Sequence, residues 1–249
     1  MKHLVASVCT AAVLWSATAM AAEIRIFSAG AVEPGLVRAV EQFQRTSGHM
    51  VTVQFNTAPQ LAKRLADGET ADILIAPPAA LDEQIKSGKV SAEGRQMLGR
   101  VGAGVVVRTS APSPDVSTSE ALKRTVLAAD SIVYNTASTG LYLDKLFERW
   151  GVLEQIKGKT TRYPNGEKVM EHIIHGSGNQ IGFGAVTEIK LFEPKGLKLV
   201  GPLPADVQNY TSYGAALMTK AASVDAAKAF LAFLATPAAK QLFVAAGIE

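Results

Sequence analysis

The segment VTVQFNTAPQLAKRLADGETADILIAPP, residues 51–78, contains one complete unit of strand, helix and strand. Residues 51–55 alternate between apolar and polar side chains, as a strand does, and residues 60–66 have the pattern of a short helix that Gly68 ends. Residues 71–76 form an apolar run, as a strand needs when both faces of a parallel sheet are covered. This order of elements predicts a right-handed crossover and a parallel sheet.

The same alternation of patterns continues on both sides of this segment. Residues 24–27 are expected to form a buried strand and residues 36–45 an amphipathic helix, and a second α/β unit begins at Glu120. The remaining strands are expected at residues 102–108, 132–134, 180–183, 198–200 and 211–219, and the remaining helices at residues 81–86, 139–150, 167–175, 224–234 and 237–246.

Two similar α/β halves with two connecting strands indicate two lobes joined by a hinge. The connections are expected near residues 102–106 and 210–215, and the C-terminal helices return to the first half. We therefore predict that residues 22–103 and 215–249 form lobe 1 and that residues 104–214 form lobe 2.

The chain begins with the features of a secretory signal peptide. Lys2 and His3 form a short basic start, residues 4–15 are apolar, and residues 17–22 offer small-residue cleavage sites. Cleavage after Ala21 makes residues 1–21 the signal peptide. The apolar run is too short to span a bilayer comfortably, which favours secretion over a membrane anchor.

Cysteine usage and charge narrow the class of protein further. The only cysteine, Cys9, lies in the middle of the signal's apolar run, which does not fit a lipoprotein signal. Residues 22–249 therefore have no disulfide, thiolate metal site or cysteine nucleophile, and a secreted protein of this size without disulfides fits the bacterial periplasm. The net charge of +3 is far from the dense basic stripe that nucleic-acid binding needs.

Four strand-like runs break into small polar residues and reopen as helices, within residues 24–36, 51–65, 131–147 and 161–174. Helix N-termini carry unpaired N–H groups and the positive end of the helix dipole, so such turns can hold anions. Ligands of open α/β sheets bind at the carboxyl ends of the strands, where all four turns fall. Ser, Thr, Asn and Gly also cap helices where no ligand binds, so any single turn leaves both interpretations open.

Common catalytic signatures are missing from the sequence. The segment around Ser177 is not a G-x-S-x-G elbow, and there is no S-x-x-K pair, G-x-G-x-x-G loop or G-K-[ST] loop. His172 and His175 are three residues apart on a predicted helix, but no third ligand accompanies them, so helix capping and surface exposure are favoured over a metal. We expect no catalytic residue, no metal site and no cofactor.

Four segments together resemble the periplasmic molybdate-binding proteins of ABC transporters. They are IFSAGAVEPGL (26–36), QLAKRLADGETADILIAPP (60–78), ASTGLYLDKLFERWGV (137–152) and QIGFGAVTEI (180–189), and the resemblance covers essentially the whole chain after the signal. It implies a type II periplasmic binding fold of the α/β class. In that fold each of two lobes is a mostly parallel sheet flanked by helices, two strands form the hinge, and the ligand is enclosed between the lobes.

The chain departs from this family at the ligand positions. In the family, the first two turns each supply a serine hydroxyl. This chain has Ala31 in the first turn and Asn-Thr-Ala-Pro, with Ala58, in the second. A late tyrosine that contacts the oxyanion in the family is replaced near Gly184 and Ala185. Each missing donor costs a desolvated oxyanion on the order of 1 kcal/mol or more. Two ligand classes therefore stay open. One is a tetrahedral oxyanion; the other is a small organic anion, favoured if Lys168 or Arg162 enters the cleft.

The resemblance implies a monomeric periplasmic solute-binding protein that encloses a small anion by lobe closure and delivers it to the permease of an ABC importer. A secreted α/β hydrolase on a two-lobed scaffold and a periplasmic sensor for a membrane receptor are the alternatives. The ligand-binding residues are expected to come from both lobes, namely Ser28, Ala29, Gly30, Ala31, Asn56, Thr57, Ala58, Ser138, Thr139, Gly140, Lys168, Val169, Gly184 and Ala185.

Overall fold

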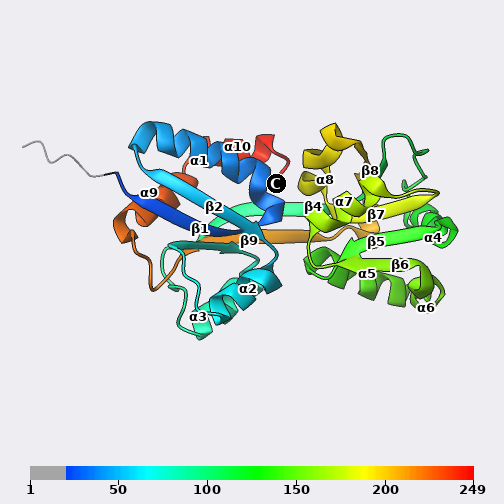
Figure 1. Ribbon diagram of the computed structural model, residues 1–249, viewed down its shortest axis with the longest axis horizontal. Coiled ribbons are helices and arrows are strands. Elements are labelled where there is room, and N and C mark those ends of the chain that lie inside the picture. Colours follow the sequence, from blue (N-terminus) through cyan, green and yellow to red (C-terminus); the bar gives the residue numbers. More distant parts are fainter. Residues whose placement is uncertain (1–20) are drawn as a thin grey trace, which may run out of the picture.

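The computed structural model describes residues 21–249. The predicted signal peptide therefore lies almost entirely outside the described residues. Figure 1 shows two α/β lobes side by side, with strands β4 and β9 running between them. The predicted two-lobed α/β fold is confirmed.

The first lobe is built on five strands in the order β2-β1-β3-β9-β4. β1 pairs in parallel with β2 and β3, as the strand–helix–strand pattern predicted, whereas β9 is antiparallel to both β3 and β4. These strands are β1 (Glu23–Ala29), β2 (Met50–Asn56), β3 (Ile73–Ala76), β9 (Tyr210–Leu217) and the first half of β4 (Gln96–Arg108).

Helices cover both faces of this sheet, and the alternation of strand side chains explains why (Figure 1). Ile24 and Ile26 of β1 pack into one core, and the neighbouring Phe27 packs into the other. Both faces therefore need apolar residues, which explains the continuous apolar run of β3 and the adjacent apolar pair Ile26 and Phe27 in β1. The helices are α1 (Glu33–Ser47), α9 (Val224–Leu234) and α10 (Pro237–Ala245) on one face, and α2 (Ala58–Ala66) and α3 (Pro78–Lys86) on the other.

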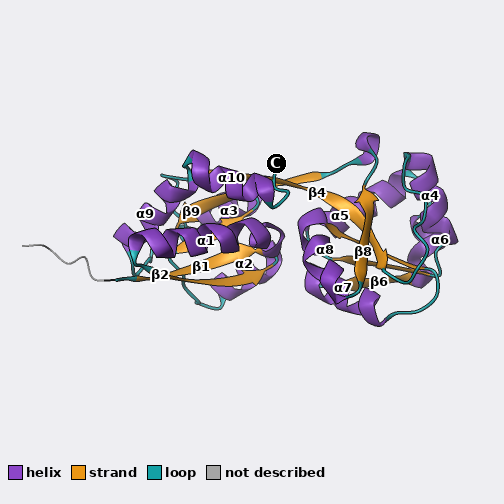
Figure 2. Cartoon of the chain, turned by 90° about the horizontal axis from the view of Figure 1, so that it is seen from above, coloured by secondary structure: helices purple, strands orange, loops and turns teal. Residues whose placement is uncertain are grey.

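The second lobe repeats this plan, and Figure 2 shows its strands with helices packed around them. β5 pairs in parallel with β6 and β7, and the second half of β4 is antiparallel to β7 and β8. Its strands are β5 (Ser131–Asn135), β6 (Thr160–Tyr163), β7 (Gln180–Ala185) and β8 (Leu197–Pro202). Its helices are α4 (Ser119–Ala128), α5 (Ser138–Arg149), α6 (Leu153–Ile156), α7 (Gly166–His175) and α8 (Val186–Phe192). Residues 21–249 also contain four short 3-10 segments, η1 (Gly30–Val32), η2 (Lys157–Lys159), η3 (Glu193–Lys195) and η4 (Ala205–Val207).

Strand β4 belongs to both lobes. Its residues up to Gly102 pair with β9, and from Ala103 onward they pair with β7 and β8. Gly102 lies opposite Tyr210, the first residue of β9, within the region where the sequence predicted the hinge. The lobe boundaries at residues 103–104 and 214–215 stay a prediction.

Helices α4, α6 and α8 were not predicted, and α8 is the one that follows β7 directly. The sequence pattern ended a strand at residue 183 and placed no helix after it, whereas β7 continues to Ala185 and α8 begins at Val186. With seven residues, α8 is too short to show a clear helical period. Across residues 21–249 there is no helix with the length and apolar character needed to cross a membrane.

Candidate ligand-binding site

The strand-to-helix turns of the two lobes meet around a small cavity of about 40 Å³. Turns after β1, β2 and β3 approach it from one lobe, and turns after β5 and β7 approach it from the other. The cavity thus lies where the carboxyl ends of the parallel strands converge. It is lined by Ala29, Gly30, Ala31, Asn56, Thr57, Ala58, Pro77, Asn135, Ala137, Ser138, Thr139, Ala185, Glu188 and Tyr213.

The turn after β2 is held by the cap of helix α2. Thr57 is the N-cap residue, and its N–H donates to Gln60 Oε1 at 3.0 Å within a capping box. The Thr57 hydroxyl lies within hydrogen-bond distance of two acceptors, Gln60 Oε1 at 2.9 Å and, in the other lobe, the Pro164 carbonyl oxygen at 3.3 Å. Thr57 is therefore positioned by its own helix and contacts both sides of the cleft.

The turn after β5 is folded by Asn135. Its Oδ1 accepts hydrogen bonds from the N–H groups of Ala137 at 3.0 Å and Gly140 at 3.1 Å. A β-carbon at Gly140 would overlap the Asn135 carbonyl oxygen, so the helix can begin this close to the strand only with glycine there. Ser138 and Thr139, the first residues of α5, consequently line the cavity at the N-terminal end of that helix.

The predicted site residues divide into two groups. Those that the structure brings together around the cavity are Ala29, Gly30, Ala31, Asn56, Thr57, Ala58, Ser138, Thr139 and Ala185. Those that lie elsewhere are Ser28, Gly140, Lys168, Val169 and Gly184. Ligand contact by any of them stays a prediction.

Each residue of the second group is engaged within its own lobe. Ser28 is fully buried, and its hydroxyl donates to the Ala29 carbonyl oxygen at 3.1 Å. Val169 is buried in the apolar core of the second lobe, and a β-carbon at Gly184 would collide with Met170 at 2.6 Å. Lys168 is exposed, and its ammonium pairs with Glu171 at 2.6 Å.

Arg162, the other candidate cation, is also engaged away from the cavity. It pairs with Asp144 at 2.7 Å and lies over the ring of Tyr134 at 4.9 Å. Among the described residues that line the small cavity, none is a lysine, arginine or histidine. An anion there would be held by N–H groups, hydroxyls and amides without a counter-cation.

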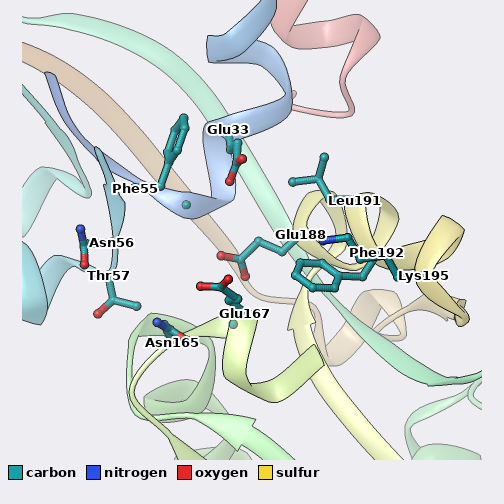
Figure 3. Close-up of a pocket in the computed structure, with 12 residues that line it drawn as sticks. Glu33, Phe55, Asn56, Thr57, Asn165, Glu167, Glu188, Leu191, Phe192 and Lys195 are labelled. Carbon is teal, nitrogen blue, oxygen red and sulfur yellow. The ribbon is translucent and has the colours of Figure 1, made fainter. Parts of the chain in front are cut away.

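A larger pocket of about 370 Å³ adjoins the small cavity and shares Gly30, Asn56, Thr57 and Glu188 with it. In Figure 3, Glu188 extends into the middle of this pocket, with Glu33 on one side and Glu167 on the other. The remaining lining residues are Phe55, Asn165, Gly166, Leu191, Phe192 and Lys195. The pocket thus combines apolar surface with three carboxyl groups.

Glu188 lies at the centre of this arrangement. A β-carbon on Gly30 would lie 2.9 Å from its Oε1, and one on Gly166 would overlap its Oε2. The carboxyl group therefore fills the space between the first residue of η1 in one lobe and the first residue of α7 in the other. Burial raises the pKa of Glu188 to about 7; the Ala185 N–H opposes this rise, and Glu33 adds to it.

The pKa values of Glu33 and Tyr213, which lie near Glu188, are raised as well. Burial and the charge of Glu167 raise the pKa of Glu33, while Lys195 acts in the opposite direction. Burial, followed by the charge of Glu188, raises the pKa of Tyr213, which keeps that phenol neutral. Burial thus shifts the proton equilibria of both Glu188 and Tyr213 toward their neutral forms.

Helix α8 also ties the two lobes together directly. The hydroxyl of Thr187 is fully buried and donates to the Ala31 carbonyl oxygen in η1 at 2.6 Å. Together with the contact between Thr57 and Pro164, this bond holds the lobes against each other at the cleft.

The sequence did not single out Pro77, Asn135, Ala137, Glu188 or Tyr213. A signal for Glu188 was available, because QIGFGA followed by VTEI is a fifth strand-to-helix turn of the kind already recognised. Tyr213 lies within β9, and no local pattern marks it.

The chemistry available here is hydrogen bonding and proton exchange. Neither pocket is lined by a histidine or a cysteine in the part of the chain that the structure describes. His172 lies 2.8 Å from the Tyr163 hydroxyl, away from both pockets. Within residues 21–249 no three His, Cys, Asp or Glu side chains are grouped as metal ligands.

The chain is similar to known proteins in both sequence and fold. The chain is 29% identical over 234 residues to an aconitate isomerase from a Pseudomonas species, covering 91% of this chain and 87% of that protein. The periplasmic molybdate-binding protein of Azotobacter vinelandii has a similar fold, with a TM-score of 0.75, 16% identity, and 91% of this chain and 98% of that one covered.

The sulfate-binding protein of Mycobacterium tuberculosis gives a TM-score of 0.73 with 18% identity, covering 91% of this chain and 86% of that one. At these identities the two structures show a shared fold alone. The family of bacterial extracellular solute-binding proteins matches the chain over residues 24–249, and the chain belongs to that family.

Proposed function

We propose that the chain binds a small organic anion between its lobes, with a carboxylate in the 40 Å³ cavity and the rest of the molecule in the adjoining pocket. The observation that carries this proposal is the convergence of the N-terminal ends of η1, α2 and α5 on one cavity, whose lining includes the hydroxyl-bearing residues Thr57, Ser138 and Thr139. Backbone N–H groups at helix N-termini and hydroxyls stabilise an anion by donating hydrogen bonds to it.

Two features favour an organic anion over a tetrahedral oxyanion. Ala31 and Ala58 line the cavity where the molybdate-binding proteins that the sequence resembles carry serine hydroxyls, so fewer donors face a desolvated ion. The pocket of about 370 Å³ beside the cavity also lies within the range of about 300–1,000 Å³ that is typical of small-molecule sites. Phe55, Leu191 and Phe192 offer apolar surface to a carbon skeleton.

The relative of 29% identity supplies a specific ligand class to test. Its name points to aconitate, an unsaturated tricarboxylic acid, and we propose ligands of this class for the present chain. Thermal unfolding of ligand-stripped protein would be followed with trans-aconitate, cis-aconitate and citrate, and with molybdate and sulfate for comparison. A ligand at a hundred times its Kd adds about 2.7 kcal/mol of stability.

Stabilisation by a tricarboxylate and not by the two oxyanions supports the proposal. Stabilisation by molybdate or sulfate alone would show that the site binds a tetrahedral oxyanion instead. If no small anion stabilises the protein, the anion site itself is refuted.

A second candidate function is isomerisation of such an acid by proton transfer. Moving a double bond along a carbon skeleton requires a group that removes a proton from one carbon and returns it to another. Glu188 reaches the cavity, and burial raises its pKa to about 7, in the range suited to a proton carrier near neutral pH. The name of the 29% identical relative favours the same reaction class.

Turnover separates the two candidates. Purified protein would be incubated with cis-aconitate in deuterated water and followed by proton NMR. Formation of the trans isomer that is lost in Glu188→Gln establishes catalysis. Tight binding without conversion leaves the chain a binding protein.

We further propose that the chain acts in the periplasm as a monomer and delivers its ligand to the permease of an ABC importer. The family match to extracellular solute-binding proteins supports this role. Deleting the gene should abolish uptake of the labelled ligand by intact cells if the chain serves transport. Unchanged uptake with loss of a ligand-dependent response would instead indicate a sensor.

A further inference from the structure

The carboxyl group of Glu188 occupies the place where an incoming anion would contact both lobes. Its Oε1 faces Gly30, the first residue of η1, and its Oε2 faces Gly166, the first residue of α7. It also lines both the small cavity and the larger pocket, so its carboxyl group lies beside an anion that spans the two. An ionised Glu188 would therefore compete with the ligand for the same donors.

The groups that face Glu188 do not neutralise its charge. Glu33 approaches from α1 and Glu167 from α7, and both add negative charge to the pocket. Tyr213 faces it from β9 as a neutral phenol. Lys195, in η3 directly after α8, is the cation of the larger pocket, and its charge acts on Glu33.

We propose that Glu188 binds the ligand as a neutral carboxylic acid, so that each anion entering the cleft is accompanied by the uptake of one proton. The inference rests on the proposed anion-binding function and deepens it; it does not rest on isomerisation, in which Glu188 would have to be ionised in the complex in order to remove a proton. In the neutral form the Glu188 O–H donates a hydrogen bond to the ligand's carboxylate, and the repulsion between two anions in contact is removed. The buried environment already favours this form, because the pKa of Glu188 is raised to about 7.

The first experiment needs no ligand. Proteins with carbon-13 at the glutamate carboxyls, wild type and Glu188→Gln, would be titrated by NMR between pH 4 and 9. One resonance titrating near pH 7 in the wild type, and missing from the variant, is the expected result. Titration of Glu188 in the ordinary range of a glutamate near pH 4.5 would overturn the inference.

The second experiment measures protons on binding. Calorimetry with trans-aconitate would be run between pH 7.5 and 9, where this probe is ionised, in two buffers with different ionisation enthalpies. The wild type is expected to take up about one proton for each ligand and to lose affinity about tenfold for each pH unit. Glu188→Gln is expected to bind with no pH dependence, and more tightly than the wild type at pH 9.

Glu167→Gln and Glu33→Gln are the matched controls, since both remove a carboxylate from the same pocket. Both controls should keep the pH dependence of the affinity. If either control loses that dependence while Glu188→Gln keeps it, the proton taken up on binding belongs to another carboxyl group and the inference is overturned. Sulfate, also ionised throughout this range, serves as a second probe. Binding of either probe without proton uptake refutes only this inference, whereas failure of both probes to bind any variant at any pH refutes the anion site itself.

Discussion

At the scale of single residues, Gly30 and Gly166 matter because of the β-carbon that they lack. Adding one would bring it to 2.9 Å from Glu188 Oε1 at Gly30, or into overlap with Oε2 at Gly166. We predict that Gly30→Ala and Gly166→Ala each displace the Glu188 carboxyl toward solvent. Its pKa should then fall from about 7 toward 4.5, and NMR titration of labelled glutamates measures this.

Gly158→Ala is the control for this pair. A β-carbon there meets no atom within 4 Å, and the residue does not have the positive φ that would strain an alanine. It should leave the titration of Glu188 unchanged. An unchanged Glu188 pKa in Gly166→Ala would mean that the carboxyl is not confined by this glycine.

A second prediction at this scale concerns Ala31 and Ala58, which line the small cavity without offering a donor. We predict that the double variant Ala31→Ser, Ala58→Ser binds molybdate more tightly than the wild type. Each new hydroxyl that reaches the ion should contribute about 1 kcal/mol, or about fivefold in affinity. Calorimetric titration with molybdate checks this, and Ala62→Ser on the same helix as Ala58 is the control. No gain in affinity would show that these positions do not face the ion.

At the scale of elements, helix α8 joins the lobes through the bond from Thr187 to the Ala31 carbonyl oxygen. Thr187→Val keeps the shape of the side chain and leaves that buried carbonyl without its donor. We predict a loss of about 1–3 kcal/mol in the free energy of unfolding, measured in urea. The lobes should also separate, which small-angle X-ray scattering detects as a larger radius of gyration.

Thr109→Val makes the same chemical change within one lobe, since the Thr109 hydroxyl donates to the Leu197 carbonyl oxygen at 3.0 Å. This control should lose stability and keep the radius of gyration. Equal scattering from the two variants would contradict the role of Thr187 between lobes.

The elements also explain what the sequence could and could not predict. The apolar strands β1 and β3 and the regular pattern of α9 were readable, because local spacing determines which side chains meet the core. The turns that line the small cavity were readable too, through their capping residues. Helix α8 was not, since seven residues carry too little periodicity, and Glu188 was missed with it. Tyr213 reaches the cavity through the pairing of β9 with distant strands, which no local pattern encodes.

At the scale of the whole molecule, Glu188 makes stability depend on pH. Its folded-state pKa of about 7 lies above the ordinary value of 4.5, so its contribution is fully present below pH 4.5 and is lost as the pH rises through 7. We predict that the wild type loses about 2–3 kcal/mol relative to Glu188→Gln over this range. Urea unfolding at intervals from pH 4 to 8 measures the difference, and a flat difference curve would contradict it.

The core of the first lobe joins opposite ends of the chain. Ile24 and Ile26 of β1 pack in the same cluster as Phe230, Phe243 and Ile248. During synthesis, the apolar face of β1 therefore cannot be covered until residues 230–248 have been made. The first lobe consequently cannot complete its fold ahead of these residues. A chain that ends before α9 should consequently leave this face exposed, although every strand of the first lobe is present.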